Sequence, residues 1–538
     1  MYKNTEYITP IIDFGTDGEG IAKPDGYTVF VPSAVKGDLA KILIVKEKKH
    51  YGYGKLLEVI EPSPLRTQPA CDVSAKCGGC SMQSVKYEHQ LEYKSGKVLE
   101  ALRRIGGFEN AVINSVTGSD PCYHYRNKAQ FPVAETSEGI KAGFYGAHSH
   151  RVVVPKECML QDNRTNAVVN EVCRWADDCG ISVYDEASGK GLLRRICMRC
   201  GKDEAVLVLV ASKKLPCTEI LIENITAQFP FVKGIVININ RERTNNVYGE
   251  RDICIYGEPF IYDTIGDIRY KVHYKSFYQV NPYTTKLLYE KALSLADCNK
   301  EQTVFDLYCG TGSISLFLAK KAKKVIGIEI VEDAVKNAQE NAQLNNITNA
   351  EFYCGAAEKL APRLIKQGEK ADTVVLDPPR KGCDEELLKA IAQMKPARVV
   401  YVSCDCATMA RDAKYLAQHG YTLKETHVFD QFPQTSHVET VVLLSQRKPD
   451  DVIEVELELG DIELTSSESK ATYSEIKNYI LRHFGFKVSS LYIAQVKQKL
   501  GLPMGKNYNL SKKGTRVPLC PPDKERAITE TLKHFKMI

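Results

Sequence analysis

A thiol and a downstream carboxylate are the residue types in this sequence most suited to covalent catalysis. The segment ARVVYVSCDCATMARD is an apolar run, expected to be a buried strand, that reaches Cys404 just before a predicted helix. A helix dipole stabilises a thiolate at that place, so Cys404 is a candidate nucleophile. Glu439 begins the next apolar run and is a candidate base; His437 is a less favoured base, and a carboxylate that only caps or pairs locally is the other possibility.

A glycine turn and two acidic strand ends have the spacing of a nucleoside-cofactor site. The run VFDLYCGTGSISL is an apolar strand that ends at Asp306, and Gly310 and Gly312 then allow close approach of a ligand. Glu329 ends the next predicted strand and could accept hydrogen bonds from two ribose hydroxyls. The turn is not GxGxxG, so S-adenosylmethionine fits better than a nicotinamide dinucleotide. Asp377, in LDPPRKG, is expected at the same edge of the sheet, with a plain strand-ending turn as the alternative.

Three cysteines in CDVSAKCGGC have the spacing of a metal site. Cys71, Cys77 and Cys80 follow C-x5-C-x2-C and leave a fourth ligand to be found. Zinc and a [4Fe-4S] cluster both accept four cysteines, and a site without metal is the third possibility. A second pair, Cys197 and Cys200, has no partner pair nearby and is interpreted as the core of a strand.

The elements that carry these residues predict a multidomain α/β protein of 538 residues. Short strands and turns over 1–62 predict an OB-like five-stranded barrel, and mixed segments over 63–262 predict a central α+β domain that contains the cysteines. Apolar strands alternate with amphipathic helices over 263–446, which indicates a Rossmann-like domain with a parallel sheet. An acidic linker, 447–472, and a small basic helical extension, 473–538, complete the chain.

Net charge is only +5, so a surface for a polyanion requires local clustering of basic side chains. One edge of the predicted barrel carries basic and aromatic side chains that could bind nucleic acid, with a solvated lysine edge as the alternative. These side chains are Lys46, Lys48, Lys49, Tyr51 and Tyr53. Arg126 and Lys128 are candidates to hold an unstacked base or, alternatively, part of an exposed strand face. The C-terminal extension, with Ser489 or Ser490 as a helix cap, is expected to contact RNA or protein.

The sequence contains no run of about 18 uncharged apolar residues, and the segment MYKNTEYITPIIDFG lacks the layout of a secretion signal. We therefore expect a cytoplasmic monomer without a membrane partner. In a reducing compartment the 18 cysteines are expected to be thiols or metal ligands rather than disulfides.

The motifs together resemble the bacterial 23S ribosomal RNA uracil-5-methyltransferases over residues 1 to about 446. The resemblance rests on KSFYQVNP, DLYCGTGSISL, GIEI, LDPPRKG, VSCDCATMARD and FPQTSHVE, and GTDGEGIAKPDGYTVFVPSAVKGD is similar to the TRAM domain, an RNA-binding barrel. It implies a Rossmann-like S-adenosylmethionine methyltransferase domain, with Cys404 as nucleophile and Glu439 as proton acceptor. The implied cofactor-binding residues are Gln279, Tyr308, Glu329 and Asp377. The resemblance also implies a [4Fe-4S] cluster whose fourth ligand is Cys158.

The reaction implied is formation of 5-methyluridine in 23S ribosomal RNA. Carbon C5 of uracil is a weak nucleophile, and addition of a thiolate at C6 raises its electron density; a base then removes the C5 proton. The family usually has proline two residues after the nucleophile, where this chain has Cys406, so a second thiol lies nearby.

Other functions remain open at this point. A transfer RNA uracil-5-methyltransferase would share the catalytic motifs, although such proteins generally lack the barrel and the cysteine cluster. A catalytically inactive RNA-binding ribosome assembly factor is the alternative from a different class. A radical methylthiotransferase would require C-x3-C-x2-C, which is not present. A DNA cytosine methyltransferase would require a Pro-Cys nucleophile motif, whereas Cys404 follows a serine, so DNA is not an expected partner.

Overall fold

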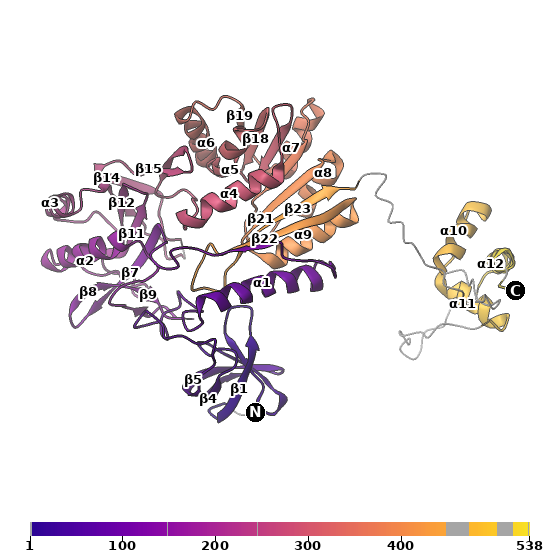
Figure 1. Cartoon of the computed structure of the whole chain (residues 1–538), viewed down its shortest axis with the longest axis horizontal. Helices are drawn as coiled ribbons and strands as arrows, with labels where there is room; N and C mark the ends of the chain where they lie inside the picture. The colour runs from indigo at the N-terminus through magenta and orange to yellow at the C-terminus, as the bar shows by residue number, and fades with distance from the viewer. Residues whose placement is uncertain (1–2, 148, 245, 448–472, 503–519, 536) are drawn as a thin grey trace. The chain divides into compact units, whose positions relative to one another are not determined.

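In the computed structural model, the described residues are 3–147, 149–244, 246–447, 473–502, 520–535 and 537–538. They belong to two units, Met1–Asp451 and Val452–Ile538, and each unit is described by itself (Figure 1). The predicted acidic linker 447–472 lies outside the described residues apart from Arg447.

The first five strands close into the barrel that the sequence predicts, in the order β1-β2-β3-β5-β4. Side chains of β4 alternate between the interior and the surface, so that Ala40, Ile42 and Ile44 are fully buried in the barrel core. The strands are β1 (Glu6–Phe14), β2 (Gly20–Ala22), β3 (Thr28–Val31), β4 (Leu39–Glu47) and β5 (Tyr51–Glu61).

A six-stranded sheet forms the middle of the first unit, in the order β14-β13-β12-β11-β7-β8. Its strands are β7 (Lys128–Thr136), β8 (Gly139–Ala142), β11 (Leu193–Cys200), β12 (Ala205–Ala211), β13 (Val232–Ile239) and β14 (Arg251–Gly257). The accompanying elements are β9 (Phe144–Tyr145), β10 (Val152–Val153), α2 (Asn163–Asp178), α3 (Thr218–Gln228), β15 (Phe260–Ile265) and β16 (Ile268–His273). Cys197 and Cys200 are buried in β11, which confirms their interpretation as strand core.

The predicted catalytic domain is an eight-stranded sheet in the order β19-β18-β17-β20-β21-β23-β22-β6. Five strands from β19 to β21 are parallel, and the β21-β23 and β23-β22 pairs are antiparallel. The strands are β6 (Ser115–Thr117), β17 (Thr303–Leu307), β18 (Lys324–Glu329), β19 (Ala350–Cys354), β20 (Thr373–Leu376), β21 (Arg398–Ser403), β22 (Tyr421–Phe429) and β23 (Glu439–Gln446). The predicted Rossmann-like arrangement is thereby confirmed.

Helices cover both faces of this sheet (Figure 1). They are α1 (Tyr87–Arg104), α4 (Pro282–Ala296), α5 (Ser313–Ala319), α6 (Glu332–Leu344), α7 (Ala357–Lys366), α8 (Glu385–Met394) and α9 (Cys406–Gln418). Two of these elements come from the part of the sequence that predicts the central domain. Helix α1 packs on α9, and β6 pairs with β22 at the sheet edge. The segment between barrel and central sheet therefore contributes to the catalytic domain.

The second unit contains α10 (Tyr473–Phe484), α11 (Ser490–Lys499) and α12 (Pro522–His534). Apolar side chains such as Ile480, Ile493 and Ile528 are fully buried between them. The Ser489 Oγ accepts a hydrogen bond from the Tyr492 amide at 3.3 Å, so Ser489 is the cap of α11. None of the helices described in either unit has the length and apolarity needed to cross a membrane.

Candidate active site

The sheet topology brings the predicted catalytic residues to one edge. Asp306 and Glu329 lie at the carboxyl ends of β17 and β18, and Asp377 and Cys404 directly follow β20 and β21. Strand β23 runs antiparallel to β21, with Thr440 opposite Ser403, so the first residue of β23 lies beside the end of β21. Five strand ends thus place the thiol and the acidic side chains at the edge where open α/β sheets bind ligands.

The Cys404 thiol is partly buried among charged groups. Burial is the largest cause that raises the pKa of Cys404, to about 11, and the Glu439 and Asp377 carboxylates raise it further. The Arg380 guanidinium hydrogen-bonds the thiol and opposes these effects. Arg380 follows the two prolines of the LDPPRKG segment, and the sequence interpretation did not include it as a site residue. At neutral pH the thiol form of Cys404 therefore predominates in the free protein.

Glu439 is almost completely buried, with 2% of its surface exposed. Burial and then the Asp377 carboxylate raise the pKa of Glu439 well above its ordinary value, while Arg380 lowers it. Burial and the Asp306 carboxylate raise the pKa of Asp377 to about 7. A carboxylate with a raised pKa is a stronger base than a solvated one, so Glu439 is suited to accept a proton near neutral pH.

Cys406 faces different groups from Cys404. It is the first residue of α9, and its Sγ lies 4.0 Å from the Lys97 carbonyl oxygen on α1. Burial raises the pKa of Cys406, the nearby Lys97 ammonium lowers it, and Asp405 raises it. The thiol beside the nucleophile in the sequence is therefore directed toward α1 and not toward the carboxylates around Cys404.

The glycine turn after β17 packs closely against α6 and β19. Gly312 has φ +78°, and a Cβ there would lie 3.1 Å from Ala338 and Phe352, so glycine is required. The Glu329 Oε2 accepts a hydrogen bond from the Gly310 amide at 3.1 Å, which ties the turn to β18.

Asp306 lies fully buried beneath this turn. Its Oδ2 accepts a hydrogen bond from the Ser315 hydroxyl, whereas Oδ1 has no partner among the described residues. Burial raises the pKa of Asp306 to about 7. A buried acceptor without a donor costs free energy, so this carboxylate is available to a ligand donor.

Three further side chains near this edge have different partners: Tyr308, Gln279 and Tyr289. Tyr308 has φ +69° and packs against the apolar cluster of the α7 and α8 side. The Gln279 Oε1 accepts a hydrogen bond from the Gln431 amide at 3.3 Å, and within the described ranges Gln279 forms no hydrogen bond with the glycine turn. Tyr289, which sequence reasoning missed, donates to the Ser313 hydroxyl at 3.0 Å.

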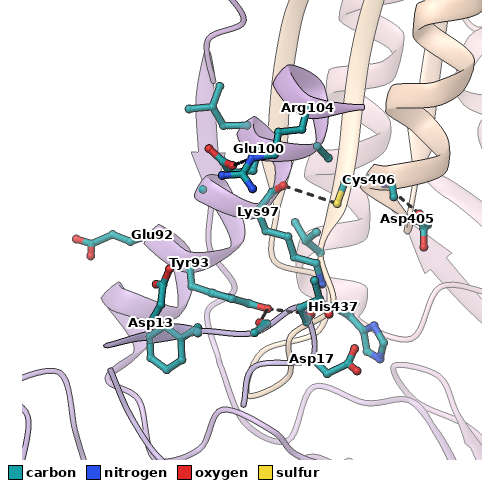
Figure 2. Close-up of a pocket in the computed structure, with 18 of the residues that line it drawn as sticks. Asp13, Asp17, Glu92, Tyr93, Lys97, Glu100, Arg104, Asp405, Cys406 and His437 are labelled. Atoms are coloured by element: carbon teal, nitrogen blue, oxygen red, sulfur yellow. Dashed lines mark hydrogen bonds and ion pairs between the residues drawn. The ribbon is translucent and has the colours of Figure 1, made fainter. Parts of the chain in front are cut away.

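A cavity of about 1140 Å³ opens onto the thiol and is lined by the barrel, α1 and the loops around Cys404 and His437 (Figure 2). The Tyr93 hydroxyl donates to the Gly15 carbonyl at 2.8 Å, and the Lys97 ammonium donates to the carbonyls of Thr16 at 2.7 Å and Ser436 at 3.1 Å. Helix α1 therefore joins a barrel loop to the loop that leads into β23.

A buried ion pair fixes the same loop from the same face of α1. The Lys94 Nζ lies 2.5 Å from the Asp430 Oδ1, and both side chains are fully buried. Gln90 and Gln434 exchange two further hydrogen bonds, at 2.9 and 3.0 Å. Removing one partner of a buried ion pair typically costs about 3–5 kcal/mol of folding stability. This network therefore holds the segment before Glu439 in place.

The four predicted metal-ligating cysteines all line a second cavity, which has a volume of about 280 Å³. Burial raises the pKa of Cys71, Cys77, Cys80 and Cys158. The Gly79 amide donates to the Cys77 sulfur at 3.4 Å, and backbone amides also bond the sulfurs of Cys71 and Cys158. Within the described residues no group of three or more His, Cys, Asp or Glu side chains stands in an arrangement that could hold a metal ion.

The predicted RNA-contacting residues fall in two places. The barrel lysines 46, 48 and 49 and both barrel tyrosines are exposed, and Tyr51 and Tyr53 pack edge to face with ring centroids 5.8 Å apart. Arg126 and Lys128 instead line the cysteine cavity. Burial, then Arg199 and Arg126, lower the pKa of Lys128 to about 7.

Comparison with known proteins agrees with this geometry. Residues 86–447 match the family described as tRNA (Uracil-5-)-methyltransferase, and residues 11–57 match the TRAM domain. The chain belongs to the tRNA (uracil-5-)-methyltransferase family. The match to both regions confirms the predicted resemblance to RNA uracil-5-methyltransferases with a TRAM domain.

Relatives of this family match nearly their whole length. A protein of Halalkalibacterium halodurans named as an uncharacterized RNA methyltransferase is 46% identical over 445 residues, which is 82% of this chain and 97% of that protein. A similarly named protein of Clostridium acetobutylicum is 45% identical over 449 residues, 82% of this chain and 98% of its own. The Pyrococcus abyssi tRNA (uracil-54, C5)-methyltransferase, solved with S-adenosyl-L-homocysteine, is 28% identical with a TM-score of 0.66 and covers 82% of this chain and 100% of its own.

Proposed function

We propose that this protein methylates C5 of a uracil in RNA, with Cys404 as the nucleophile and Glu439 as the base. The observation that carries the proposal is that one thiol and two carboxylates with raised pKa values, Glu439 and Asp377, meet at the carboxyl edge of the catalytic sheet. The thiol also lines a cavity large enough for a nucleotide that has left its stack.

The reaction follows from the placement of these two groups. Cys404 loses its proton to a neighbouring carboxylate, and the thiolate sulfur forms a bond to C6, so the C5–C6 double-bond electrons move to an enolate. Bound S-adenosylmethionine would supply the methyl group: C5 would attack its methyl carbon, the bond between that carbon and sulfur would break, and S-adenosylhomocysteine would leave. Glu439 then removes the C5 proton, the C5–C6 double bond reforms, and the bond between C6 and sulfur breaks. The raised pKa of the buried Glu439 favours this proton transfer.

Two observations support S-adenosylmethionine as the methyl donor. Asp306 Oδ1 is a buried acceptor without a donor among the described residues, and Glu329 lies at the end of β18, where it could accept hydrogen bonds from ribose hydroxyls. The structure of the P. abyssi relative contains the demethylated form of this donor. We propose Gln279, Tyr308, Glu329 and Asp377 as donor-binding residues.

We propose 23S ribosomal RNA as the substrate, because the chain combines a TRAM barrel with the cysteine cavity. Transfer RNA is the competing substrate, since the P. abyssi relative is a transfer RNA methyltransferase. The exposed Tyr51 and Tyr53 with the barrel lysines supply stacking and charge that either RNA could use.

We further propose that Cys71, Cys77, Cys80 and Cys158 hold a [4Fe-4S] cluster. A zinc ion needs sulfurs about 2.3 Å away on every side, so four thiolates would converge on one point. Here the four thiols surround a cavity of about 280 Å³ and receive backbone amide hydrogen bonds, which suits a larger group. The cluster would link Cys158 to the cysteine loop before α1 and so have a structural role. Methyl transfer itself needs no electrons.

Mass spectrometry of uridines tests the catalytic proposal. Unmodified 23S RNA and unmodified transfer RNA are incubated separately with S-adenosylmethionine and either wild type or Cys404→Ala. We expect 5-methyluridine in 23S RNA with wild type and none with the variant. Product confined to transfer RNA would move the substrate assignment to transfer RNA, and product from the Cys404→Ala protein would refute the nucleophile.

A further inference from the structure

Helix α9 begins two residues after Cys404 and is fixed to the chain at that point by a capping residue. The Asp405 side chain accepts hydrogen bonds from the Ala407 amide at 3.0 Å and from the Thr408 amide at 2.9 Å. Asp405 directly follows Cys404 in the sequence, so this cap holds the backbone at the thiol against the first turn of α9.

The side chain of Thr408 lies between this first turn and the arginine loop, which comprises residues 378–383. Its hydroxyl donates to the Arg380 carbonyl at 3.1 Å and lies 3.2 Å from both the carbonyl oxygen and a carboxylate oxygen of Asp405. One side chain therefore contacts the residue after Cys404 and also the residue whose guanidinium hydrogen-bonds the Cys404 thiol.

The next turn of α9 holds the end of the arginine loop. The Arg411 guanidinium donates to the carbonyls of Lys381 at 3.0 Å and Cys383 at 3.3 Å. The fully buried Asp412 accepts hydrogen bonds from the Cys383 amide and from the Tyr401 hydroxyl, each at 2.7 Å. Since a buried carboxylate is costly without its donors, these contacts fix the loop to both α9 and β21.

The arginine loop approaches α9 more closely than a side chain at Gly382 would allow. Gly382 has φ +76°, and a Cβ there would lie 2.6 Å from an Arg411 nitrogen, 2.7 Å from an Asp412 oxygen and 3.0 Å from the Thr408 Cβ. Glycine at this position therefore permits the backbone of the loop to pack directly on the helix.

We propose that Thr408 and Arg411 are positioning residues that hold the Arg380 guanidinium beside the nucleophilic thiol. The inference rests on the proposed role of Cys404 as nucleophile. The thiol is attached to α9 through the Asp405 cap, and the guanidinium is attached to the same helix through the loop carbonyls. A single rigid helix thus sets the separation of the two groups, which both line the large cavity, and a cation beside the thiol favours the thiolate that attacks C6.

The rate at which Cys404 is alkylated in the full-length protein tests this role. Iodoacetamide labelling of the peptide that contains Cys404 is followed by mass spectrometry between about pH 7 and pH 10, below the thiol pKa of about 11. We expect Thr408→Val to slow labelling about two- to tenfold, the range that corresponds to the loss of one hydrogen bond, because a displaced Arg380 favours the thiolate less. Thr408→Ser keeps the hydroxyl and should label like wild type. The control Thr218→Val, which changes a half-buried threonine in the first turn of α3, should do so as well.

Combination with Arg380→Gln separates positioning from a general structural effect. If Thr408 acts through Arg380, the double variant Thr408→Val/Arg380→Gln should label at the same rate as Arg380→Gln alone. Arg411→Gln replaces an exposed side chain and should slow labelling in the same direction, so it provides the test if Thr408→Val does not fold.

The other outcomes overturn the proposal or separate it from the proposed function. Labelling of Thr408→Val and Arg411→Gln at the wild-type rate would overturn it, even if the midpoint of thermal unfolding falls. A double variant that is slower than Arg380→Gln by the full factor of the single change would overturn it too. Formation of 5-methyluridine by wild type is measured in the same preparations. If wild type forms no product but the labelling rates are as expected, the proposed function fails and the positioning of Arg380 stands.

Discussion

The catalytic edge and the cysteine cavity both contain buried thiols, but their charged neighbours have opposite signs. Cys404 lies near two carboxylates, Glu439 and Asp377, which raise its pKa, and near the Arg380 guanidinium, which lowers it. The four cavity cysteines lie beside Arg126 and Lys128, and none of the described residues that line their cavity carries a carboxylate.

This difference separates two uses of the same side chain. Burial is the largest cause that raises the pKa of Cys404, and the neighbouring carboxylates raise it further; in the proposed reaction one of them, Glu439, is the base. Burial also raises the pKa of the four cavity thiols, which would have to lose their protons to bind a metal. Burial is therefore common to both sets of thiols, and the sign of the neighbouring charges is what differs.

Among the substitutions around Cys404, Glu439→Gln should cause the largest loss of turnover. The amide keeps the shape of the buried side chain but cannot accept the C5 proton, so turnover should fall about 10²- to 10⁴-fold and the RNA adduct should accumulate. Denaturing gel electrophoresis with labelled RNA would show the adduct, and Cys404→Ala/Glu439→Gln should show none. An adduct that accumulates with His437→Gln and not with Glu439→Gln would assign the base to His437.

Cys80→Ala tests the proposed metal site on the other side of this comparison. We expect lower iron content and a lower midpoint of thermal unfolding, because metal binding contributes to folding stability. Elemental analysis and thermal denaturation of the full chain would measure both, with the exposed Cys254→Ala as the matched control. Unchanged iron and stability would remove Cys80 from the ligand set.

The rate at which Cys404 is alkylated should depend on the charges of its neighbours. At pH 8, below the thiol pKa of about 11, the thiolate fraction rises about tenfold for each pH unit. Asp377→Asn removes a negative neighbour, lowers the thiol pKa and should accelerate iodoacetamide labelling; Arg380→Gln should slow it. Quantitative mass spectrometry of the peptide that contains Cys404 gives the rates. Slower labelling of Asp377→Asn or faster labelling of Arg380→Gln would contradict the electrostatic account.

Cys406→Ala should have the smallest effect. Its thiol is directed toward Lys97 on α1, away from the carboxylates around Cys404, so turnover should stay close to wild type. The same methylation assay with labelled S-adenosylmethionine measures it. A loss comparable to that of Cys404→Ala would show that the second thiol takes part in the reaction.

Much of the architecture could be predicted from local patterns. Short strands separated by turns predicted the barrel, and the alternation of strands and helices predicted the Rossmann-like sheet, because both patterns are local properties of the chain. Cys404 and the acidic strand ends could be selected because parallel strands deliver their carboxyl ends to one edge. Arg380, Tyr289 and the Lys94–Asp430 pair could not be selected, since their partners are distant in the sequence.

The sequence by itself determined the residue types that chemistry requires: the thiol at Cys404, the carboxylates, the glycine turn and the cysteine spacing. Only the tertiary structure decided which charges surround each thiol. Burial and the sign of the neighbouring charges depend on contacts between elements, such as Glu439 on β23 beside Cys404 after β21, or Lys128 on β7 in the cavity of Cys158. These contacts set the pKa values and hence the chemistry of otherwise identical side chains.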